Sequence, residues 1–104
     1  MLVPCETAIK HFLPAVKANI AKELTNRYNF NQIDTASKLD ITQAAVSKYL
    51  SSDYSDAIKR VEKKKKVGEI SKKIAFSIVK ERVNKQEIGN LFCKYCKQFL
   101  GSTC

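Results

Sequence analysis

The segment NQIDTASKLDITQAAVSKYL, residues 31–50, constrains the fold of this chain more than any other part of the sequence. Its apolar residues repeat at helical spacing in two short groups, which are Ile33, Ala36 and Leu39 followed by Val46, Tyr49 and Leu50. Between the two groups, LDIT leaves room for only a tight turn. The sequence therefore predicts a helix-turn-helix within an all-α protein.

Three residues in this segment suit such a turn. Ala36 is small enough to let two helices cross closely. Asp40 stands where glycine is usual, and aspartate is among the few other residues that tolerate a left-handed backbone. Thr42 is a good N-cap, because its hydroxyl accepts a backbone N–H from the first turn of the second helix.

With Val46 and Leu50 turned toward the core, the second helix exposes a polar surface suited to DNA. A glutamine at its start can make a bidentate contact to adenine, an alanine can touch a thymine methyl group, and a serine or lysine can reach bases or phosphates. Gln32 opens the first helix, where its amide and free backbone N–H groups can hold a phosphate. The candidate DNA-binding residues are Gln32, Thr42, Gln43, Ala44, Ser47 and Lys48.

Two further helices are expected before this segment. Pro4 suits the start of the first, because its missing N–H has no intrahelical acceptor there, and Pro14 is expected to break it. A second helix then carries an apolar stripe over residues 16–24, with Lys22 on the opposite, solvent-facing side. Residues 26–29 are expected to end it.

Helical patterns continue beyond residue 55. Residues 56–66 are expected to be helical but strongly charged, with Gly68 as a weak point. A stripe at helical spacing follows, suited either to core packing or to a dimer seam, and its members are Val67, Ile70, Ile74, Ile78 and Val83. Asn84 with Glu87 resembles a capping box that opens a last helix ending at Gly101.

The charge of the chain points to an anionic partner. It carries 19 Lys and Arg against 10 Asp and Glu, a formal net charge of +9, and nucleic acid is the commonest partner of a small basic protein. We therefore expect double-stranded DNA. Residues 1–58 carry equal numbers of acidic and basic side chains, so phosphate contacts are expected from Lys59, Arg60, Lys63, Lys64, Lys65, Lys66, Lys72 and Lys73.

Several classes of protein are disfavoured. No apolar run is long enough for a membrane span and no secretion signal is visible, so a cytoplasmic protein with no membrane partner is expected. There is no Gly-rich phosphate loop, no acid/base pair and no nucleophile with a companion, so neither an enzyme nor a small-molecule substrate is expected. We expect a DNA-binding domain over residues 1–55 and a helical dimerisation and cysteine-bearing extension over residues 56–104.

Four cysteines complete the set of candidate functional residues. Cys93 and Cys96 form a C-x-x-C pair, whose thiols project from one side of a helical turn, and Cys5 and Cys104 lie near the two ends of the sequence. In a reducing compartment four thiols suit a 4Fe-4S cluster or a tetrahedral zinc ion better than structural disulfides. Ligand type separates iron from zinc poorly. A cluster is the preferred interpretation, with zinc and free or disulfide-forming thiols as alternatives.

A glutamine opens each helix of the expected pair, Gln32 and Gln43, which resembles phage-repressor-type regulators. More closely, PCE near the start, LP at residues 13–14, ITQAAVSKYL and the late cysteines resemble a family of small archaeal helix-turn-helix transcriptional regulators. The cysteine spacing is similar to that of several iron–sulfur transcription factors. These resemblances imply a dimeric transcription factor.

We therefore expect a homodimeric DNA-binding regulator that responds to redox state or oxygen through a four-cysteine iron–sulfur cluster. A homodimer is expected for two reasons. A single recognition helix reads few base pairs, and the stripe from Val67 to Ile78 exceeds what one short helix must bury. Two other functions stay open. One is a constitutive DNA-binding protein with structural zinc, and the other is a small iron–sulfur redox protein whose helices only scaffold the cluster.

Overall fold

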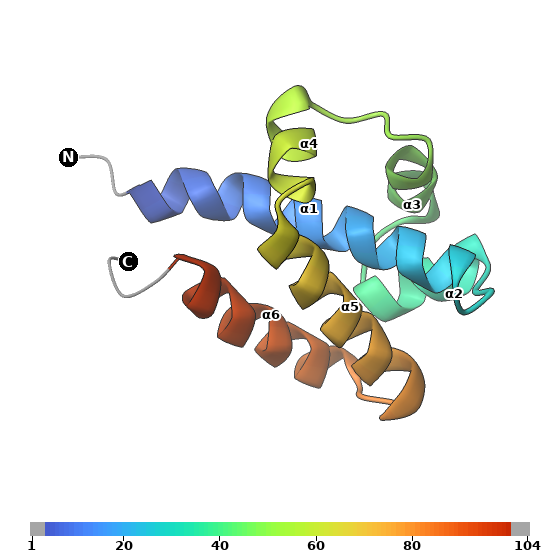
Figure 1. Ribbon diagram of the computed structural model, residues 1–104. Coiled ribbons are helices and arrows are strands. Elements are labelled where there is room, and N and C mark those ends of the chain that lie inside the picture. The colour runs from blue at the N-terminus through green and yellow to red at the C-terminus, as the bar shows by residue number, and fades with distance from the viewer. Residues whose placement is uncertain (1–3, 101–104) are drawn as a thin grey trace.

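The computed structural model describes the backbone of residues 4–100 and the side chains of residues 11–95, and this part of the chain is helical with no strand, as the sequence predicts. The helices are α1 (Pro4–Asn26), α2 (Gln32–Leu39), α3 (Gln43–Leu50), α4 (Asp56–Glu62), α5 (Lys65–Lys80) and α6 (Lys85–Leu100). In Figure 1, α1 runs through the middle of the molecule, with α3 and α4 above it and most of α5 and α6 below. None of these helices combines the length and the hydropathy needed to cross a membrane.

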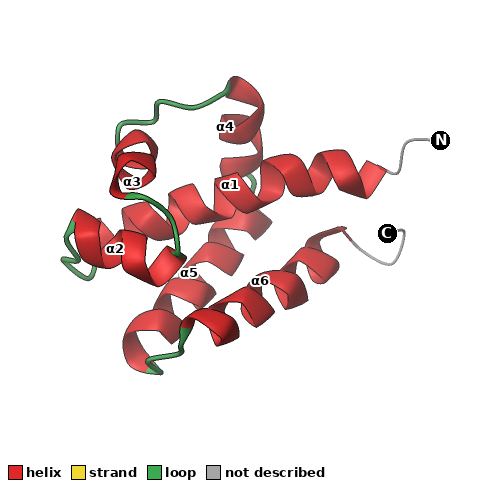
Figure 2. Ribbon diagram, turned by 180° about the vertical axis from the view of Figure 1, so that it is seen from behind, coloured by secondary structure: helices red, strands yellow, loops and turns green. Residues whose placement is uncertain are grey.

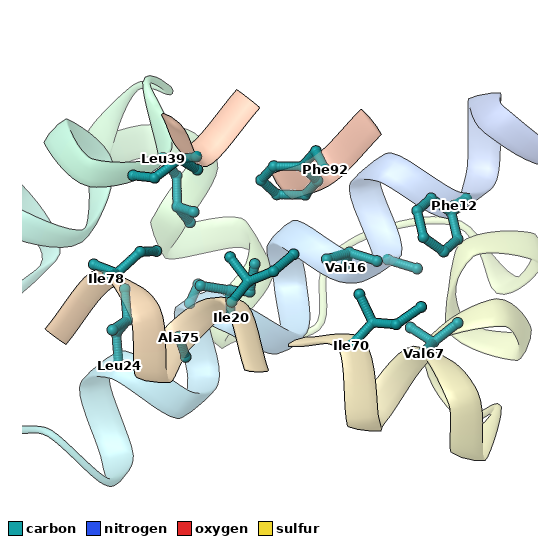
Figure 3. Close-up of a cluster of buried hydrophobic side chains, with 14 residues drawn as sticks. Phe12, Val16, Ile20, Leu24, Leu39, Val67, Ile70, Ala75, Ile78 and Phe92 are labelled. Carbon is teal, nitrogen blue, oxygen red and sulfur yellow. The ribbon is translucent and has the colours of Figure 1, made fainter. Parts of the chain in front are cut away.

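The core lies where α1 meets α5. Phe12, Val16, Ile20 and Leu24 are fully buried and recur every four residues on α1, so they form one ridge along that helix. Apolar side chains of α5 pack around this ridge (Figure 3), and they are Val67, Ile70, Ile74, Ala75 and Ile78. The two helices therefore hold each other through continuous apolar stripes.

α1 is one continuous helix through Pro14, so the expected break at this proline is wrong. Proline lacks an N–H for the carbonyl four residues earlier, which costs a helix about 3 kcal/mol. Phe12 and Val16, on either side of it, are both fully buried, and complete burial of such a side chain contributes about 1.5–3 kcal/mol. A break between them would take part of the ridge away from α5. The predicted end is confirmed, because α1 ends at Asn26 and Asn29 has a left-handed backbone with φ of 60°.

α2 and α3 are joined by a three-residue turn whose local bonds agree with the prediction. Asp40 is left-handed, with φ of 56° and ψ of 46°. The N–H of Ile41 donates to the carbonyl of Ala36 at 3.0 Å, as in a Schellman motif. Thr42 caps α3, because its hydroxyl oxygen accepts the N–H of Ala45 at 3.1 Å. The turn thus satisfies its own backbone groups.

The buried side of α2 differs from the expected stripe. Ala36 and Leu39 are buried as predicted, but Ile33 is 65% exposed and Thr35 is fully buried. The Thr35 hydroxyl donates to the carbonyl of Asn31 at 2.8 Å, so its burial leaves no unpaired polar group. A helix of eight residues has little more than two turns, and rotating it by one residue still produces an apolar stripe. Only packing against the other helices selects the rotation.

The charged segment 56–66 is two helices rather than one, because α4 ends at Glu62 and α5 begins at Lys65. The break is explained by the apolar side chains of α4 and α5 that contact the core. Ile58 and Val61 contact the core from α4, and Val67 and Ile70 do so from α5. In an unbroken helix, at about 100° per residue, these two pairs would point in opposite directions. Gly68, the expected weak point, lies inside α5 and not at the break.

The apolar stripe of α5 is buried within a single chain, so the core-packing alternative is confirmed and these residues are not available as a dimer seam. Val67 and Ile74 are fully buried, and Ile78 is 2% exposed. The same cluster includes Leu39 of α2 and Phe92 of α6. Residues before and after position 55 therefore contribute to one apolar cluster.

α6 begins with the predicted capping box. The N–H of Glu87 donates to the side-chain oxygen of Asn84 at 2.8 Å, and the N–H of Asn84 donates to the Glu87 carboxylate at 3.3 Å. These reciprocal bonds fix the start of α6 directly after the turn that follows α5. Gly101, the expected end of the helix, lies outside the described residues.

We expect Ile74→Ala to lower the free energy of unfolding by about 2–5 kcal/mol, because truncation leaves a cavity at a fully buried site against α1. Phe76→Ala on the same helix is the matched control. Phe76 is 51% exposed, so its truncation should change stability by no more than about 0.5 kcal/mol. Urea denaturation followed by circular dichroism measures both. Equal losses would contradict this packing of α5.

Candidate nucleic-acid interface

α3 exposes the side chains that the sequence assigns to DNA reading. Its fully buried residue is Val46, whereas Tyr49 and Leu50 are half-buried. The exposed residues occupy positions i, i+1, i+4 and i+5, so they share one face of the helix. This face, which we call the α3 face, consists of Gln43, Ala44, Ser47 and Lys48.

The other two candidates lie where the helices begin. Gln32 is the first residue of α2 and is half-buried, whereas Thr42 is exposed and caps α3. Asn31 caps α2 in the same way, because its side-chain oxygen accepts the N–H of Asp34 at 2.7 Å. Both caps fix where their helices begin. The expected DNA contacts of Gln32 and Thr42 stay predictions.

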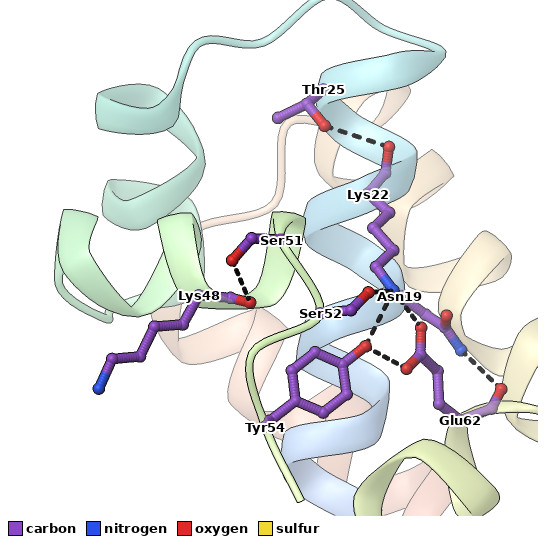
Figure 4. Close-up of polar contacts among 8 residues, drawn as sticks. All are labelled: Asn19, Lys22, Thr25, Lys48, Ser51, Ser52, Tyr54 and Glu62. Carbon is purple, nitrogen blue, oxygen red and sulfur yellow. Dashed lines mark hydrogen bonds and ion pairs between the residues drawn. The ribbon is translucent and has the colours of Figure 1, made fainter. Parts of the chain in front are cut away.

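Lys22 of α1 is the centre of a polar network beside α3. Its Nζ lies 2.7 Å from Glu62 Oε2 on α4, 2.8 Å from Tyr54 Oη and 3.3 Å from Ser52 Oγ. These three acceptors match the three donors of an ammonium group. The Tyr54 hydroxyl in turn donates to the other oxygen of Glu62. Figure 4 shows these side chains converging between α1, α4 and the loop after α3.

Two further contacts extend this network. The side-chain amide of Asn19 donates to the backbone carbonyl of Glu62 at 3.2 Å. The ring of Tyr54 meets the ring of Tyr49 edge to face, with centroids 5.9 Å apart and planes at 74°. Because Tyr49 belongs to α3, the network connects α3 to both α1 and α4. We refer to Asn19, Lys22, Ser52, Tyr54 and Glu62 as the Lys22 network.

The sequence did not predict this network, and it placed Lys22 on a solvent-facing side. In the structure the Lys22 side chain is only 28% exposed and that of Glu62 is 12% exposed. The three partners of Lys22 lie 30, 32 and 40 residues further along the chain. Helical periodicity reports neighbours three and four residues apart. No local signal could therefore have found this network.

The network shifts two protonation equilibria. Burial lowers the pKa of Lys22, but hydrogen bonds to Glu62 and Tyr54 outweigh it, so the pKa is raised overall. Burial and the bond to Glu62 raise the pKa of Tyr54, and Lys22 opposes them only in part. Both shifts favour a charged ammonium and a neutral phenol, which are the states that the observed hydrogen bonds require.

The basic residues divide between different helices around α1. Lys59 and Arg60 lie on α4, which is on the same side of α1 as α3 in both views (Figures 1 and 2), whereas Lys72 and Lys73 lie on α5. The Lys59 ammonium lies 5.8 Å from the centre of the Tyr54 ring, so it borders the Lys22 network. Lys59 therefore lies beside the polar network that contacts α3.

Cys93 is exposed and its thiol is free. The side chains of the other expected ligands, Cys5, Cys96 and Cys104, lie outside the described residues. Between residues 11 and 95, no three His, Cys, Asp or Glu side chains come together as a metal site. The four-cysteine site stays a prediction.

Comparison with protein-family models, with curated proteins and with solved structures gives no match to this chain.

We expect the free energy of unfolding to fall as pH rises from about 9 to about 11, with part of this fall due to the Lys22 network. Lys22 has a raised pKa, so its contribution is present below its ordinary value of 10.5 and is lost above its folded value. Tyr54 also has a raised pKa, so above its ordinary value of 10.0 ionisation favours the unfolded chain. Tyr54→Phe should flatten the fall.

Urea denaturation at several pH values measures this dependence. Tyr28→Phe is the control, because Tyr28 is a half-buried tyrosine that is not a member of the Lys22 network. An identical pH dependence in wild type and Tyr54→Phe would show that Tyr54 does not contribute to the fall.

Proposed function

We propose that the chain binds double-stranded DNA and regulates transcription, with α2 and α3 acting as a helix-turn-helix and α3 entering the major groove. The observation that carries this proposal is the α3 face, where four exposed side chains stand together on an eight-residue helix. The caps and the Lys22 network hold this helix in place. Reading base edges requires side chains that are oriented before binding.

Each side chain of the α3 face has a suitable partner in the major groove. The amide of Gln43 matches N6 and N7 of adenine, and the methyl group of Ala44 matches the methyl group of thymine. The hydroxyl of Ser47 can pair with several bases, and Lys48 can reach guanine or a phosphate. These contacts supply specificity.

Phosphate contacts come from two places in this proposal. The start of α2 leaves backbone N–H groups without intrahelical acceptors, and the amide of Gln32 lies there. Lys59 and Arg60 on α4 add positive charge on the same side of α1. Such contacts raise the affinity for all sequences and depend strongly on salt.

A homodimer belongs to this proposal, because one copy of α3 reads only a few base pairs. The apolar stripe of α5 does not supply the interface, since it is buried in the core of each chain. The two copies must therefore meet through another surface. Their separation would set the spacing of the two half-sites.

We further propose that Cys5, Cys93, Cys96 and Cys104 hold a redox-responsive iron–sulfur cluster, with structural zinc as the alternative. In both views α1 begins and α6 ends at the same side of the molecule (Figures 1 and 2), which favours one site shared by these two helices. Cys93 lies on α6 and is exposed. Loss of the cluster would act on α1, which carries the Lys22 network and so affects α3.

In selection from randomised duplexes, we expect the full chain to enrich a defined sequence. Gln43→Ala and Ser47→Ala should each reduce the preference for that duplex over a random one by about 1–3 kcal/mol, because each removes a base-edge contact. Fluorescence anisotropy with both duplexes measures the ratio of affinities.

The control is Asn90→Ala, which removes an exposed amide from α6 and should leave this ratio unchanged. Lys59→Ala and Arg60→Ala should weaken binding to both duplexes and reduce the salt dependence. The proposal fails if no sequence is enriched, or if Gln43→Ala weakens both duplexes equally.

Protein purified without oxygen should contain iron and sulfide, and the double variant Cys93→Ser/Cys96→Ser should lose both. Exposure to air and the double variant should each weaken binding to the selected duplex. Metal analysis, visible absorption and anisotropy measure these effects. Bound zinc with affinity unchanged in air would favour the structural alternative, and unchanged affinity in every case would remove the sensor role.

A further inference from the structure

A pocket of about 440 Å³ opens between α1 and α5. Its wall on α1 includes Asn19, Lys22, Asn26 and Arg27, and its wall on α5 includes Gly68 and Lys72. The volume lies within the range of sites for small molecules. Cations and amides supply five of the eight lining residues, although much of the surface that faces the pocket is apolar.

The charges around the pocket favour an anion. Lys22, Arg27 and Lys72 are positive, and Glu23 is the one acidic residue of the lining. Glu23 is already engaged, because its carboxylate lies 2.8 Å from Nε of Arg27. Lys72 is exposed and makes no ion pair within the described part of the chain. With three cations and one carboxylate, the lining carries a formal net charge of +2, which favours a ligand with two anionic groups.

Gly68 keeps one wall of the pocket open. Glycine is, after proline, the least favourable residue within a helix. A Cβ at this position would meet nothing within 4 Å, so packing does not require glycine here. The absence of a side chain at Gly68 leaves free space on the side of α5 that lines the pocket.

Lys22 is shared between this pocket and the network beside α3. Its ammonium reaches Glu62, Tyr54 and Ser52, and the same side chain contributes to the pocket wall. Glu62, Tyr54 and Ser52 already accept the three donors of this ammonium, so an anion in the pocket would have to displace one of them to bind Lys22 directly.

We propose that the pocket binds a small metabolite carrying two or more phosphate or carboxylate groups, and that its binding shifts the position of α3. The second part rests on the proposed function, because it links the pocket to DNA binding. The first part does not, since it concerns only the residues between α1 and α5. Occupancy of the pocket would then regulate DNA affinity by drawing Lys22 away from Glu62.

Isothermal titration calorimetry of the full chain tests whether the pocket binds such an anion. Inorganic pyrophosphate and citrate serve as separate probes at constant ionic strength. Lys72→Glu and Gly68→Leu should each weaken binding at least tenfold, by reversing a charge and by filling the pocket. Lys80→Glu is the control, because it makes the same charge change at an exposed position of α5 outside the pocket lining. Binding of pyrophosphate alone would identify a phosphorylated ligand, and binding of citrate alone a polycarboxylate.

The proposed anion site is wrong if neither probe binds. It is also wrong if Lys72→Glu and Lys80→Glu weaken probe binding equally. Circular dichroism shows whether Gly68→Leu is folded, and Lys72→Glu tests the pocket without changing a packed residue. The second part has two readouts, the NMR signals of Tyr54 and the affinity for the selected duplex. If the bound probe leaves both unchanged, the coupling is wrong. If the chain binds the probe, with a shift in the NMR signals of Tyr54, and yet binds no DNA, that result supports the anion site and contradicts the proposed function.

Discussion

The packing of α1 against α5 is the interaction on which the rest of the structure depends. The ridge of Phe12, Val16, Ile20 and Leu24 is fully buried, and it requires α1 to remain one straight surface despite Pro14. Once this ridge faces α5, the remaining sides of α1 are left for α3, α4 and α6 (Figure 1). Burial of several large side chains along one line outweighs the single backbone bond that the proline removes.

α3 is attached to this core in a different way. Val46 is its only fully buried residue in the described structure, so apolar burial alone holds it weakly. The Lys22 network adds polar contacts from the following loop to α1 and α4, and the edge-to-face pair of Tyr49 and Tyr54 connects them to α3. A helix held by polar bonds at one end can change position without disturbing the core. Lys22 belongs both to this network and to the wall of the pocket between α1 and α5.

The predicted elements agree with the structure wherever local chemistry decides them, and they differ where distant contacts decide. The all-helical class, the left-handed Asp40 and the cap at Thr42 depend on residues within one turn of each other. Ile33 was assigned to the core and is exposed, because the rotation of so short a helix depends on its neighbours. Exposure of the α3 face was predictable, since it follows from the burial of Val46. The Lys22 network was not.

The sequence by itself determined where helices begin after Asn31, Thr42 and Asn84, because each of these side chains bonds to a backbone N–H three residues away. It also determined which face of α3 is polar. Only the tertiary structure decided that the stripe of α5 packs on α1, that the lysine-rich segment divides, and that Lys22 meets Glu62. The physical reason is distance along the chain. A cap forms within one turn, whereas these contacts join segments that become neighbours only when the whole core is assembled.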